Sequence, residues 1–259
     1  MVSLIQAIIL SIVQGITEWF PISSSGHLAL FQQFFGFQNL SFDVFLHFAS
    51  VLAVIIIFWK DIVDISYLRK NKTPKYLLFF IIALVPAGIV GILFRDFIKG
   101  FFSSSLYLGI FFMFSGIIVY LTKFSRPRAI RKRDNLDFFD SIFIGCFQAI
   151  AIFPGVSRSG FTISSGLFRG LSKKTAISFS FLLSIPLILG ASLLEMRNIV
   201  FGEVNYFILL VSFIITFLVS FITIKLLLKI IRSEKFYLFG VYNLILGLVI
   251  FIYSLSQVF

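Results

Sequence analysis

The sequence contains little charge and only one cysteine. Charged residues make up 13% of the 259-residue chain and hydrophobic residues 59%, whereas soluble domains are about one quarter charged. This composition excludes an ordinary soluble globular protein. The single cysteine, Cys146, excludes an internal disulfide, so cysteine usage says nothing about the redox compartment.

Several common functional motifs are also missing. The chain has no GxxxxGK[ST], HExxH or CxxC pattern and no GxGxxG of mechanistic use. Because no ATP-binding motif is present, primary pumping is not expected. We also expect no secretory signal peptide, because the first apolar stretch lacks a basic n-region and an A-x-A-like site.

Long apolar stretches are abundant instead. Each of six is about long enough to cross a hydrocarbon core of roughly 30 Å. They lie near residues 43–59, 76–94, 106–122, 175–194, 206–224 and 237–257. The sequence therefore predicts an all-α, multi-pass integral membrane protein.

Basic residues are concentrated in alternate loops. One set of loops holds 18 of the lysines and arginines and the other set holds 3. The rich set comprises 60–75, 123–134, 169–174 and 225–235, and the poor set comprises 95–105 and 194–205. The rich set is therefore predicted to be cytoplasmic. The net charge of +11 does not point to nucleic acid, because no aromatic-interleaved basic groove accompanies it.

Two polar segments interrupt the apolar sequence and resemble each other. Each runs from a Gln through an apolar turn to a Pro, and then into a Ser/Gly cluster that opens a new apolar stretch. They cover residues 14–27 and 148–162 and begin 134 residues apart. Repeated polar breaks of this kind are typical of a binding site at the interface of two repeats.

The broken segments, residues 3–35 and 140–168, are predicted to be re-entrant helix–loop–helix elements. Non-helical backbone at membrane depth is tolerated only where protein or a water-filled cavity covers it. If both re-enter, all the basic loops fall on one side and both termini face outside. We therefore expect six spans in an inverted-topology repeat forming one functional membrane domain. Residues 1–124 form the first repeat, 125–137 a cytoplasmic linker and 138–259 the second repeat.

The first broken segment carries a carboxylate and a Ser/His cluster. Gln14 and Glu18 are four residues apart and share a helix face, and an ionisable residue in an apolar segment indicates a functional site. The alternative is that Glu18 lies at a hydrated helix end and has only a structural role. The Ser/His cluster comprises Ser23, Ser24, Ser25, Gly26 and His27. It supplies hydroxyls, an imidazole and free backbone N–H groups that can bind an anion. The alternative is a polar cluster that only caps the following helix.

The second broken segment carries Arg158. An arginine at this depth requires an anionic partner, and its planar fork matches phosphate oxygens. The alternative is an Arg158–Glu18 pair that acts only as a structural lock. Neighbouring hydroxyls and glycines can add donors to an anion: Ser157, Ser159, Thr162, Gly155 and Gly160.

Three further polar residues lie inside or at the ends of predicted spans. We interpret His47 as an interior histidine, Asp43 as a cap or first-turn acid and Asn243 as an ordinary interior residue.

At the two motifs, and over essentially its whole length, the chain resembles the undecaprenyl-diphosphate phosphatase family of the bacitracin-resistance type. The family's first motif is Glu/Gln-x-x-x-Glu followed by Pro-x-Ser-Ser-Thr/Ser-Gly-His. Its second is Pro-Gly-x-Ser-Arg-Ser-Gly with a Thr two residues on. The matching residues are Gln14, Glu18, Pro21, Ser23 to His27, Pro154 to Gly160, and Thr162. Gln14 stands where Glu is commoner, and Ser25 where Thr is commoner.

The resemblance implies hydrolysis of a C55 isoprenoid diphosphate to its monophosphate and inorganic phosphate. It also implies dependence on a divalent cation, Mg²⁺ or Ca²⁺, in a bacterial cell membrane. The reaction recycles the lipid carrier for peptidoglycan synthesis and confers bacitracin resistance. The sequence leaves the oligomeric state open, with a homodimer as one option, and it does not show which membrane face the site opens to.

Phosphoryl transfer suggests a role for each residue. We expect Ser24 to attack, His27 to move the proton, Arg158 to neutralise the phosphate, and Glu18 with Gln14 to hold the cation. Ser25 or water are the alternative nucleophiles. The phosphate-binding set is Arg158, Ser157, Ser159, Thr162, Ser23, Ser25, Gly26, Gly155 and Gly160. The rival function is a transporter or flippase of the prenyl phosphate lipid, which would use the same anion site.

Overall fold

The computed structural model describes residues 2–66, 74–125, 136–196, 205–230 and 235–257, and every regular element in them is a helix. The all-α prediction is therefore confirmed for this part of the chain. Most of the predicted linker, and parts of three of the other basic or connecting loops, lie outside the described residues.

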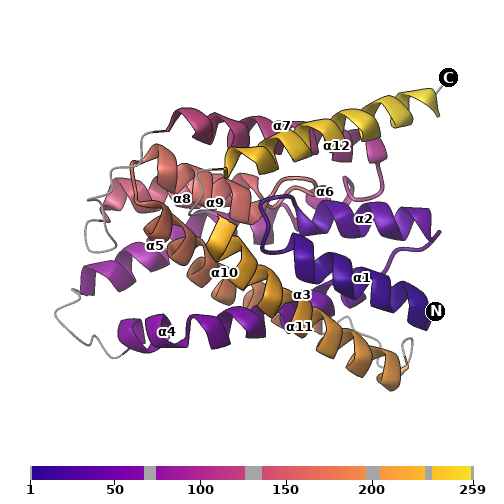
Figure 1. The fold of residues 1–259 in the computed structure, drawn as a ribbon, viewed down its shortest axis with the longest axis horizontal. Helices are drawn as coiled ribbons and strands as arrows, with labels where there is room; N and C mark the ends of the chain where they lie inside the picture. Colours follow the sequence, from indigo (N-terminus) through magenta and orange to yellow (C-terminus); the bar gives the residue numbers. More distant parts are fainter. Residues whose placement is uncertain (1, 67–73, 126–135, 197–204, 231–234, 258–259) are drawn as a thin grey trace.

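In the described part of the chain, six helices are long and apolar enough to cross a membrane; Figure 1 labels each of them. They coincide with the predicted apolar stretches, so a multi-pass membrane protein is confirmed at this level. Their bounds are α3 (Leu40–Ile57), α5 (Pro74–Leu93), α7 (Ser105–Leu121), α10 (Lys173–Met196), α11 (Tyr206–Ile230) and α12 (Tyr237–Ser256).

The broken segments each form two short helices joined by a loop. Capping boxes start the first helix of each, with Ser3 and Gln6 in one and Asp137 and Asp140 in the other. The four helices are α1 (Leu4–Thr17), α2 (Ser24–Phe34), α8 (Phe138–Ile150) and α9 (Arg158–Phe168). The remaining short elements are α4 (Trp59–Ser66), α6 (Arg95–Lys99) and the 3₁₀ turn η1 (Thr122–Phe124).

Helices α7 and α12 lie side by side and approach at paired glycines (Figure 1). A Cβ on Gly247 would lie 2.7 Å from the Gly109 carbonyl oxygen, and one on Gly240 would lie 2.7 Å from the Gly116 oxygen. Gly109 pairs with Gly247 and Gly116 with Gly240, so the order of contacts is reversed between the two helices and they run antiparallel. Small residues of this kind let backbones pack closely where the lipid supplies no hydrophobic driving force.

The short helices pack against long ones. α1 lies on α11, α8 lies on α5, and α3 contacts both α10 and α11. A Cβ on Gly15 of α1 would lie 2.7 Å from Val219 of α11, and one on Gly145 of α8 would lie 2.8 Å from the Ala83 oxygen of α5. Each broken segment is therefore held tightly against a long helix.

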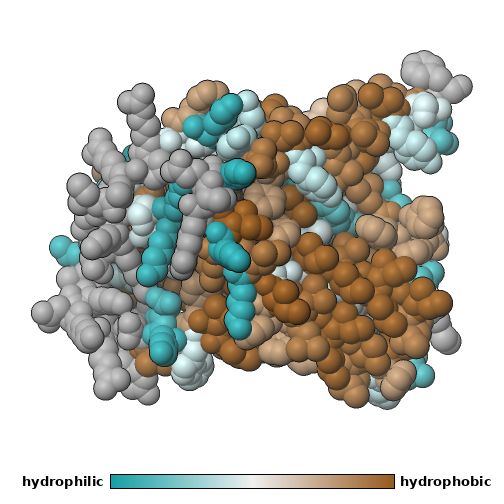
Figure 2. All heavy atoms as spheres, in the orientation of Figure 1, coloured by the Kyte–Doolittle hydropathy of each residue, from teal (hydrophilic) through white to brown (hydrophobic). Residues whose placement is uncertain are grey.

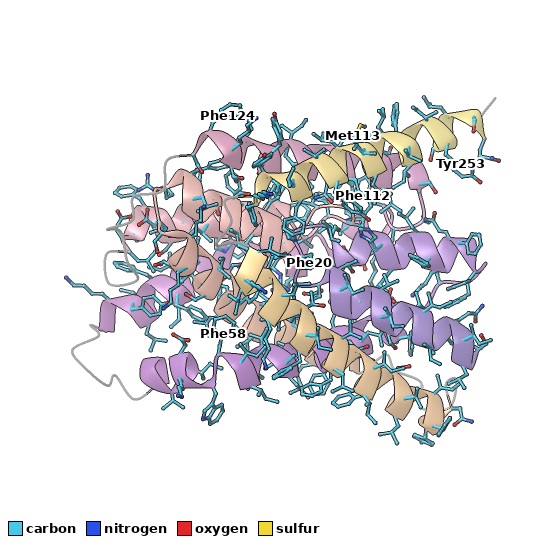
Figure 3. The ribbon with its side chains drawn as sticks, in the orientation of Figure 1. Phe20, Phe58, Phe112, Met113, Phe124 and Tyr253 are labelled. Carbon is cyan, nitrogen blue, oxygen red and sulfur yellow. The ribbon has the colours of Figure 1, made fainter. Side chains whose placement is uncertain are left out.

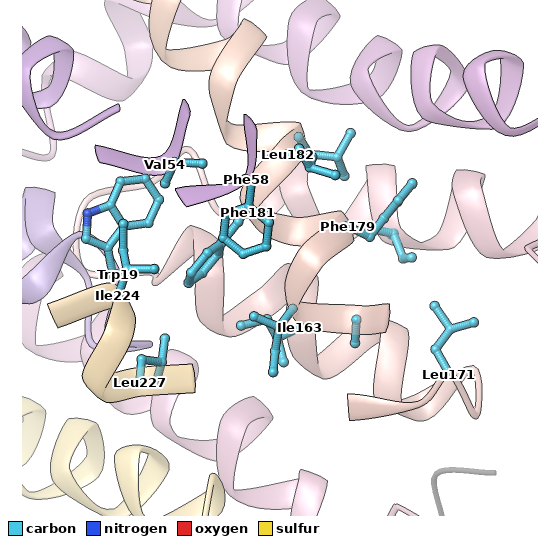
Figure 4. Packing of buried hydrophobic residues seen from close by; sticks show 14 of the residues in the cluster. Trp19, Val54, Phe58, Ile163, Leu171, Phe179, Phe181, Leu182, Ile224 and Leu227 are labelled. Atoms are coloured by element: carbon cyan, nitrogen blue, oxygen red, sulfur yellow. The ribbon is translucent and has the colours of Figure 1, made fainter. Parts of the chain in front are cut away.

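The largest buried cluster anchors the first broken loop (Figure 4). Trp19, next to Glu18, is almost completely buried and meets Phe181 of α10 edge to face at 5.1 Å between ring centroids. Phe181 in turn contacts Phe58 after α3. Edge-to-face aromatic pairs of this kind contribute about 0.5–1.5 kcal/mol each, and they fix the loop next to its polar residue.

The surface has one hydrophilic end and a broad apolar belt. Figure 2 shows hydrophobic residues over the middle and right of this face, and hydrophilic ones toward the left, where the ends of α5 and α8 lie. In Figure 3, Phe20 and Phe112 lie near the middle of the molecule, and Tyr253 lies toward the C-terminal end of α12. The broken loops therefore lie between the ends of the long helices.

Candidate active site

The two broken loops touch at glycines. A Cβ on Gly26 would lie 2.9 Å from the Gly155 Cα and 2.6 Å from the Phe112 ring. Gly155 has a φ of 93°, which is costly for residues with a Cβ. Ser23 adopts a φ of 68° without being glycine, and such strain is a recurrent feature of functional loops. Close backbone approach brings the two motifs together.

Serine caps begin both second helices. The Ser23 Oγ accepts a hydrogen bond from the Gly26 N–H at 3.3 Å, and the Ser157 Oγ accepts one from the Gly160 N–H at 3.0 Å. The Ser25 Oγ lies 3.5 Å from the Ser23 Oγ. Ser23 and Ser157, predicted to bind phosphate, therefore already serve as N-caps of α2 and α9.

Glu18 is the centre of the polar cluster. Its Oε2 accepts hydrogen bonds from the Gln14 Nε2 at 3.0 Å and from the Ser24 Oγ at 2.6 Å. The His47 Nε2 lies 3.2 Å from the same oxygen. The Arg158 Nη2 donates to Glu18 Oε1. We refer to these five residues as the polar centre.

The charges around Glu18 keep it ionised. His47 and Arg158 lie against its two oxygens and supply positive charge, which favours the ionised carboxylate. Hydrogen bonds from His47 and Ser24 act in the same direction. Glu18 is therefore a carboxylate that accepts hydrogen bonds.

Arg158 has an unused donor. Its Nη1 is buried and has no hydrogen-bond partner, while Nη2 is engaged by Glu18. A buried, unpaired guanidinium nitrogen is costly unless a ligand satisfies it. Only half of the planar fork is therefore used by the protein, and the other half suits an anionic oxygen.

His47 lies in the polar centre, although its sequence suggested an ordinary interior histidine. Its Nδ1 lies 2.7 Å from the Asp43 carbonyl oxygen, and its Nε2 lies 3.5 Å from the Ser24 Oγ. Both ring nitrogens thus face oxygen acceptors, which fits the doubly protonated ring. Asp43 is in the first turn of α3, as expected, and accepts from Gln32 at 2.5 Å. A polar pair one turn apart in an apolar helix was the available signal for this site.

His27 is held away from Ser24. Its Nδ1 lies 2.7 Å from the Ser23 carbonyl oxygen and its Nε2 lies 2.8 Å from the Tyr242 hydroxyl. Because a carbonyl only accepts, Nδ1 carries a proton and Nε2 of the neutral ring accepts from Tyr242. Its ring also stacks on Tyr242 and meets Phe112 edge to face. The hydrogen bonds of His27 thus go elsewhere than to Ser24, and its role as proton shuttle stays a prediction.

The chain matches one described protein family over most of its length. Residues 7–249 match the family model described as bacitracin resistance protein BacA. The chain belongs to this family.

Named relatives cover nearly the whole chain. "Undecaprenyl-diphosphatase 1" of Shouchella clausii is 40% identical, over 97% of this chain and 97% of its own. "Undecaprenyl-diphosphatase" of Halothermothrix orenii is 37% identical, over 95% and 96%. A protein of the same name from Methanosphaera stadtmanae is 36% identical, over 98% and 99%. Because some relatives are archaeal, membership of the BacA family does not by itself indicate a bacterial source.

The hydroxyls after Arg158 hold the BacA-family motif in shape. The Ser159 Oγ donates to the Phe20 carbonyl oxygen at 3.3 Å and so ties the second loop to the first. The Thr162 Oγ1 donates to the Arg158 carbonyl oxygen at 2.8 Å and lies 2.5 Å from the Ser180 Oγ. Both were predicted to contact phosphate, and in this structure both make internal contacts.

Helices α7 and α12 contribute two residues that the motifs did not reveal. The Ser115 Oγ of α7 accepts from the Ser157 N–H at 3.1 Å. The Asn243 Nδ2 of α12 donates to the Pro21 carbonyl oxygen at 2.9 Å. Asn243 is thus more than an ordinary interior residue. In the glycine-packed pair, α7 therefore holds the second broken loop through Ser115, and α12 holds the first through Asn243.

Few side-chain oxygens are placed to bind a cation. The Gln14 Oε1 is buried without a hydrogen-bond partner, next to the Glu18 carboxylate. Among the residues that the structure describes, no group of three or more His, Cys, Asp or Glu is placed to hold a metal. Magnesium and calcium prefer several oxygen ligands. The Gln14 and Glu18 oxygens fit part of such a shell, with water and substrate completing it.

Proposed function

We propose that this protein hydrolyses undecaprenyl diphosphate to undecaprenyl phosphate and inorganic phosphate. The observation that carries the proposal is the meeting of a hydroxyl, a carboxylate and a half-unpaired guanidinium at Ser24, Glu18 and Arg158. Membership of the BacA family and the names of its relatives support it. The cellular role would be recycling of the lipid carrier for peptidoglycan, which gives bacitracin resistance, in the cell membrane.

Arg158 would bind the terminal phosphate. Its unpartnered Nη1 offers the donor that a phosphate oxygen requires. The second oxygen of a bidentate pair would compete with Glu18 for Nη2. Phosphoryl transfer spreads charge over the equatorial oxygens, so a fixed guanidinium beside them stabilises the transition state.

Ser24 would act as the nucleophile. Its Oγ attacks the terminal phosphorus, the bond from that phosphorus to the bridging oxygen breaks, and prenyl phosphate leaves. The Ser24 proton passes to Glu18 Oε2, which already accepts its hydrogen bond at 2.6 Å. Water then attacks the phosphorus of the phosphoserine, the bond from that phosphorus to Ser24 Oγ breaks, and inorganic phosphate leaves. Glu18 returns its proton to Ser24 Oγ, which restores the hydroxyl.

The two histidines would have different tasks. His47 hydrogen-bonds the Glu18 carboxylate and adds positive charge beside Ser24. His27 lies one turn from Ser24 on α2, so it can act at the lipid side of the diphosphate. The Ser24–His27 relay stays a prediction, while the contacts of His27 in this structure go to Ser23 and Tyr242.

We also propose that Glu18 and Gln14 hold a divalent cation, Mg²⁺ or Ca²⁺, together with the substrate. When bound, such an ion neutralises the diphosphate oxygens. Glu18 and Gln14 would orient the phosphate relative to Ser24. Ser25 and the first-turn N–H groups of α2 and α9 would complete the anion site.

The architecture is proposed to be an inverted repeat with two re-entrant hairpins. Its units are residues 1–124 and 138–259, joined by 125–137. The matching pairs α1–α2 and α8–α9, the similar packing of α1 on α11 and α8 on α5, and the antiparallel α7–α12 contact support it. A two-fold axis in the membrane plane relates such repeats.

Both termini are proposed to face outside. A cysteine-accessibility experiment tests this in a Cys146→Ser background, because Cys146 is exposed. We expect Asn205→Cys to react with an impermeant maleimide in intact cells, and Lys60→Cys to react only after permeabilisation. Labelling of both from the same side contradicts the topology.

Phosphate release from purified protein tests the activity itself. We expect release from undecaprenyl diphosphate that stops when a chelator removes divalent cations. A prenyl-phosphate flippase is the second candidate, because broken helices in inverted repeats are typical of transporters. Lipid movement across vesicles without phosphate release would favour the flippase. Size measurement in detergent would decide whether the protein is a homodimer.

A further inference from the structure

Gln32, near the C-terminal end of α2, is buried and uses both ends of its amide to contact the start of α3. Its Nε2 donates to the Asp43 Oδ1 at 2.5 Å, and its Oε1 accepts from the Asn39 N–H at 2.8 Å. Asn39 is the N-cap of α3, and Asp43 is buried in its first turn. A buried amide and a buried carboxylate would each be costly without these bonds. The pair therefore ties α2 to the first turn of α3.

Asp43 also contacts His47 through its main chain. The Asp43 carbonyl oxygen lies 2.7 Å from the His47 Nδ1. The His47 Nε2 in turn lies 3.5 Å from the Ser24 Oγ of α2 and 3.2 Å from Glu18 Oε2. The contacts that start at Gln32 thus run through Asp43 and His47 and return to α2 at Ser24. Linked hydrogen bonds in a buried setting strengthen one another, so this ring couples the two helices at the polar centre.

Apolar contacts between α2 and α3 do not fix this alignment by themselves. Leu28 of α2 belongs to the same buried cluster as Phe42 and Leu46 of α3. Because apolar burial is non-directional, such a cluster tolerates small rotations of one helix against the other. A hydrogen bond requires a donor–acceptor distance of about 2.9 Å and weakens steeply as its angle falls. The Gln32 amide therefore supplies the directional contact between the helices that carry Ser24 and His47.

The neighbouring Gln33 makes equivalent bonds to a different part of the molecule. Its Nε2 donates to the Phe102 carbonyl oxygen at 3.0 Å, and its Oε1 accepts from the Ser105 Oγ at 2.7 Å. Ser105 is the first residue of α7. Both amides thus use a donor and an acceptor, but only the Gln32 amide leads to His47. Gln33 is therefore a matched control for Gln32.

We propose that Gln32 and Asp43 are positioning residues that hold His47 beside Ser24 and Glu18. The inference rests on the proposed diphosphatase function and adds how the imidazole is kept in the polar centre. The Asp43 carboxylate anchors α2, and the Asp43 carbonyl oxygen orients the ring. A misplacement of about 1 Å, even from a change far from the reacting atoms, can lower turnover strongly.

Three variants separate this role from a general loosening of α2. Gln32→Leu removes both bonds of its amide, and Gln33→Leu removes the same number from the adjacent residue. The exchange variant Gln32→Glu/Asp43→Asn reverses donor and acceptor. The new amide at 43 donates to the new carboxylate at 32, whose other oxygen still accepts from the Asn39 N–H. The quantities are kcat and KM for phosphate release from undecaprenyl diphosphate.

We expect Gln32→Leu to lower kcat by roughly 5- to 20-fold with little change in KM, because Arg158 remains in place to bind the diphosphate. Gln33→Leu and the exchange variant should stay within about twofold of wild type. In a His47→Ala background, Gln32→Leu should cause almost no further loss, since the imidazole that it positions is gone.

Four results overturn the proposal. They are an unchanged kcat in Gln32→Leu, equal losses in Gln32→Leu and Gln33→Leu, and a full additional loss in the His47→Ala background. The fourth is an exchange variant as slow as Gln32→Leu, which would assign Asp43 a role through its charge.

Chemical modification of histidine gives a reading that does not depend on hydrolysis. The chain has two histidines, so His27 serves as an internal reference for His47. Diethyl pyrocarbonate acylates a free imidazole nitrogen, and both ring nitrogens of His47 are engaged. We expect its modification rate, followed by mass spectrometry, to rise severalfold in Gln32→Leu and to return to the wild-type value in the exchange variant. The rate at His27 should not change.

An unchanged rate at His47 in Gln32→Leu overturns the positioning role. Where Gln32→Leu does not fold, the exchange variant decides alone: a wild-type rate at His47 supports the proposal, and a raised rate overturns it. The expected rates in a protein that releases no phosphate contradict the diphosphatase activity, while the positioning of His47 by Gln32 and Asp43 stands.

Discussion

Counted from Gln14 and Gln148, the two broken segments place different side chains at matching positions. Glu18 in the first corresponds to Ile152 in the second, Ser24 to Arg158 and His27 to Phe161. The frames are alike, because a serine Oγ caps the second helix of each segment through the N–H of a glycine. The hydroxyl and the carboxylate belong to the first segment, and the guanidinium belongs to the second.

Gln14 and Gln148 occupy matching positions but make different hydrogen bonds. Gln14 donates to Glu18, whereas Gln148 donates to the Ala83 carbonyl oxygen of α5 at 3.2 Å. Each is a buried side chain whose Oε1 lacks a hydrogen-bond partner. The first therefore joins the polar centre and the second holds α8 to its neighbour. The comparison indicates that the two segments share the same helix caps and backbone arrangement, whereas the proposed catalytic side chains are divided between them.

The largest effect should come from Arg158, the charged residue between Gln148 and Thr162 in the second segment. Arg158→Lys should lower turnover on undecaprenyl diphosphate by about 10²–10³-fold, because a point charge cannot replace the fork. Arg158→Ala should be worse. Arg169→Lys is the control at the end of α9, where Arg169 pairs with Asp137 and Asp140. Near-normal turnover of Arg158→Lys in a phosphate-release assay would contradict the division of roles.

The hydroxyl of the first segment should be almost as important. Ser24→Ala should lower turnover by roughly two orders of magnitude or more, because it removes the nucleophile. Ser25→Ala should cost less, since the Ser25 hydroxyl lies next to the Ser23 cap. A phosphoserine trapped by rapid quenching and located by mass spectrometry would show covalent catalysis. Full activity of Ser24→Ala would exclude this residue from the mechanism.

Substituting each histidine compares the roles that the observed contacts suggest with the roles that the sequence motif suggests. His47→Ala should lower turnover by roughly 10- to 100-fold, because it removes a charge and a hydrogen bond from Glu18. His27→Ala should have a smaller effect, because its bonds go to Ser23 and Tyr242. Steady-state rates of the two variants test this order. A larger loss in His27→Ala would restore the Ser24–His27 relay that the motif predicts.

A metal titration tests Glu18, whose matching position in the second segment is taken by Ile152. Glu18→Gln should raise the Mg²⁺ or Ca²⁺ concentration for half-maximal activity by about tenfold or more, and Gln14→Glu should lower it. Gln148→Glu, at the matching place in the second segment, is the control. An unchanged metal requirement in both site variants would assign Glu18 to orienting Arg158 and Ser24 alone.

The smallest effect should come from the hydrogen bond to His27. Tyr242→Phe keeps the stacked ring but loses the 2.8 Å bond, so kcat/KM should fall by only about 2- to 10-fold. Tyr253→Phe on the same helix is the control, because Tyr253 is exposed. Equal rates for both variants would show that Tyr242 acts only through its apolar surface.

The membrane-spanning helices were predictable because their signal is local. An apolar run of sufficient length must form its own backbone hydrogen bonds in a bilayer, which a helix does within one segment. Each of the six predicted stretches falls largely within such a helix, as 206–224 does within α11. Helix caps at Ser23 and Ser157 are similarly local, since donor and acceptor are three residues apart.

The polar centre was only partly predictable. Glu18, Ser24 and Arg158 were visible as polar residues in apolar sequence, and their meeting follows the expected pairing of buried charges. His47 was interpreted as an ordinary interior histidine, because the Asp43–His47 pair one turn apart does not by itself distinguish packing from contact with a site. Tyr242 and Asn243 carry no motif at all, yet they bond to His27 and Pro21.

The sequence by itself determined that the chain lies in a membrane and that two polar loops interrupt it, because hydrophobicity and backbone hydrogen bonding act over short stretches. Only the tertiary structure decided which groups meet. Arg158 and Glu18 are 140 residues apart, and their contact depends on glycine-packed helices α7 and α12 and on the approach of Gly26 to Gly155. Long-range contacts of this kind depend on how whole helices pack, which no local pattern encodes.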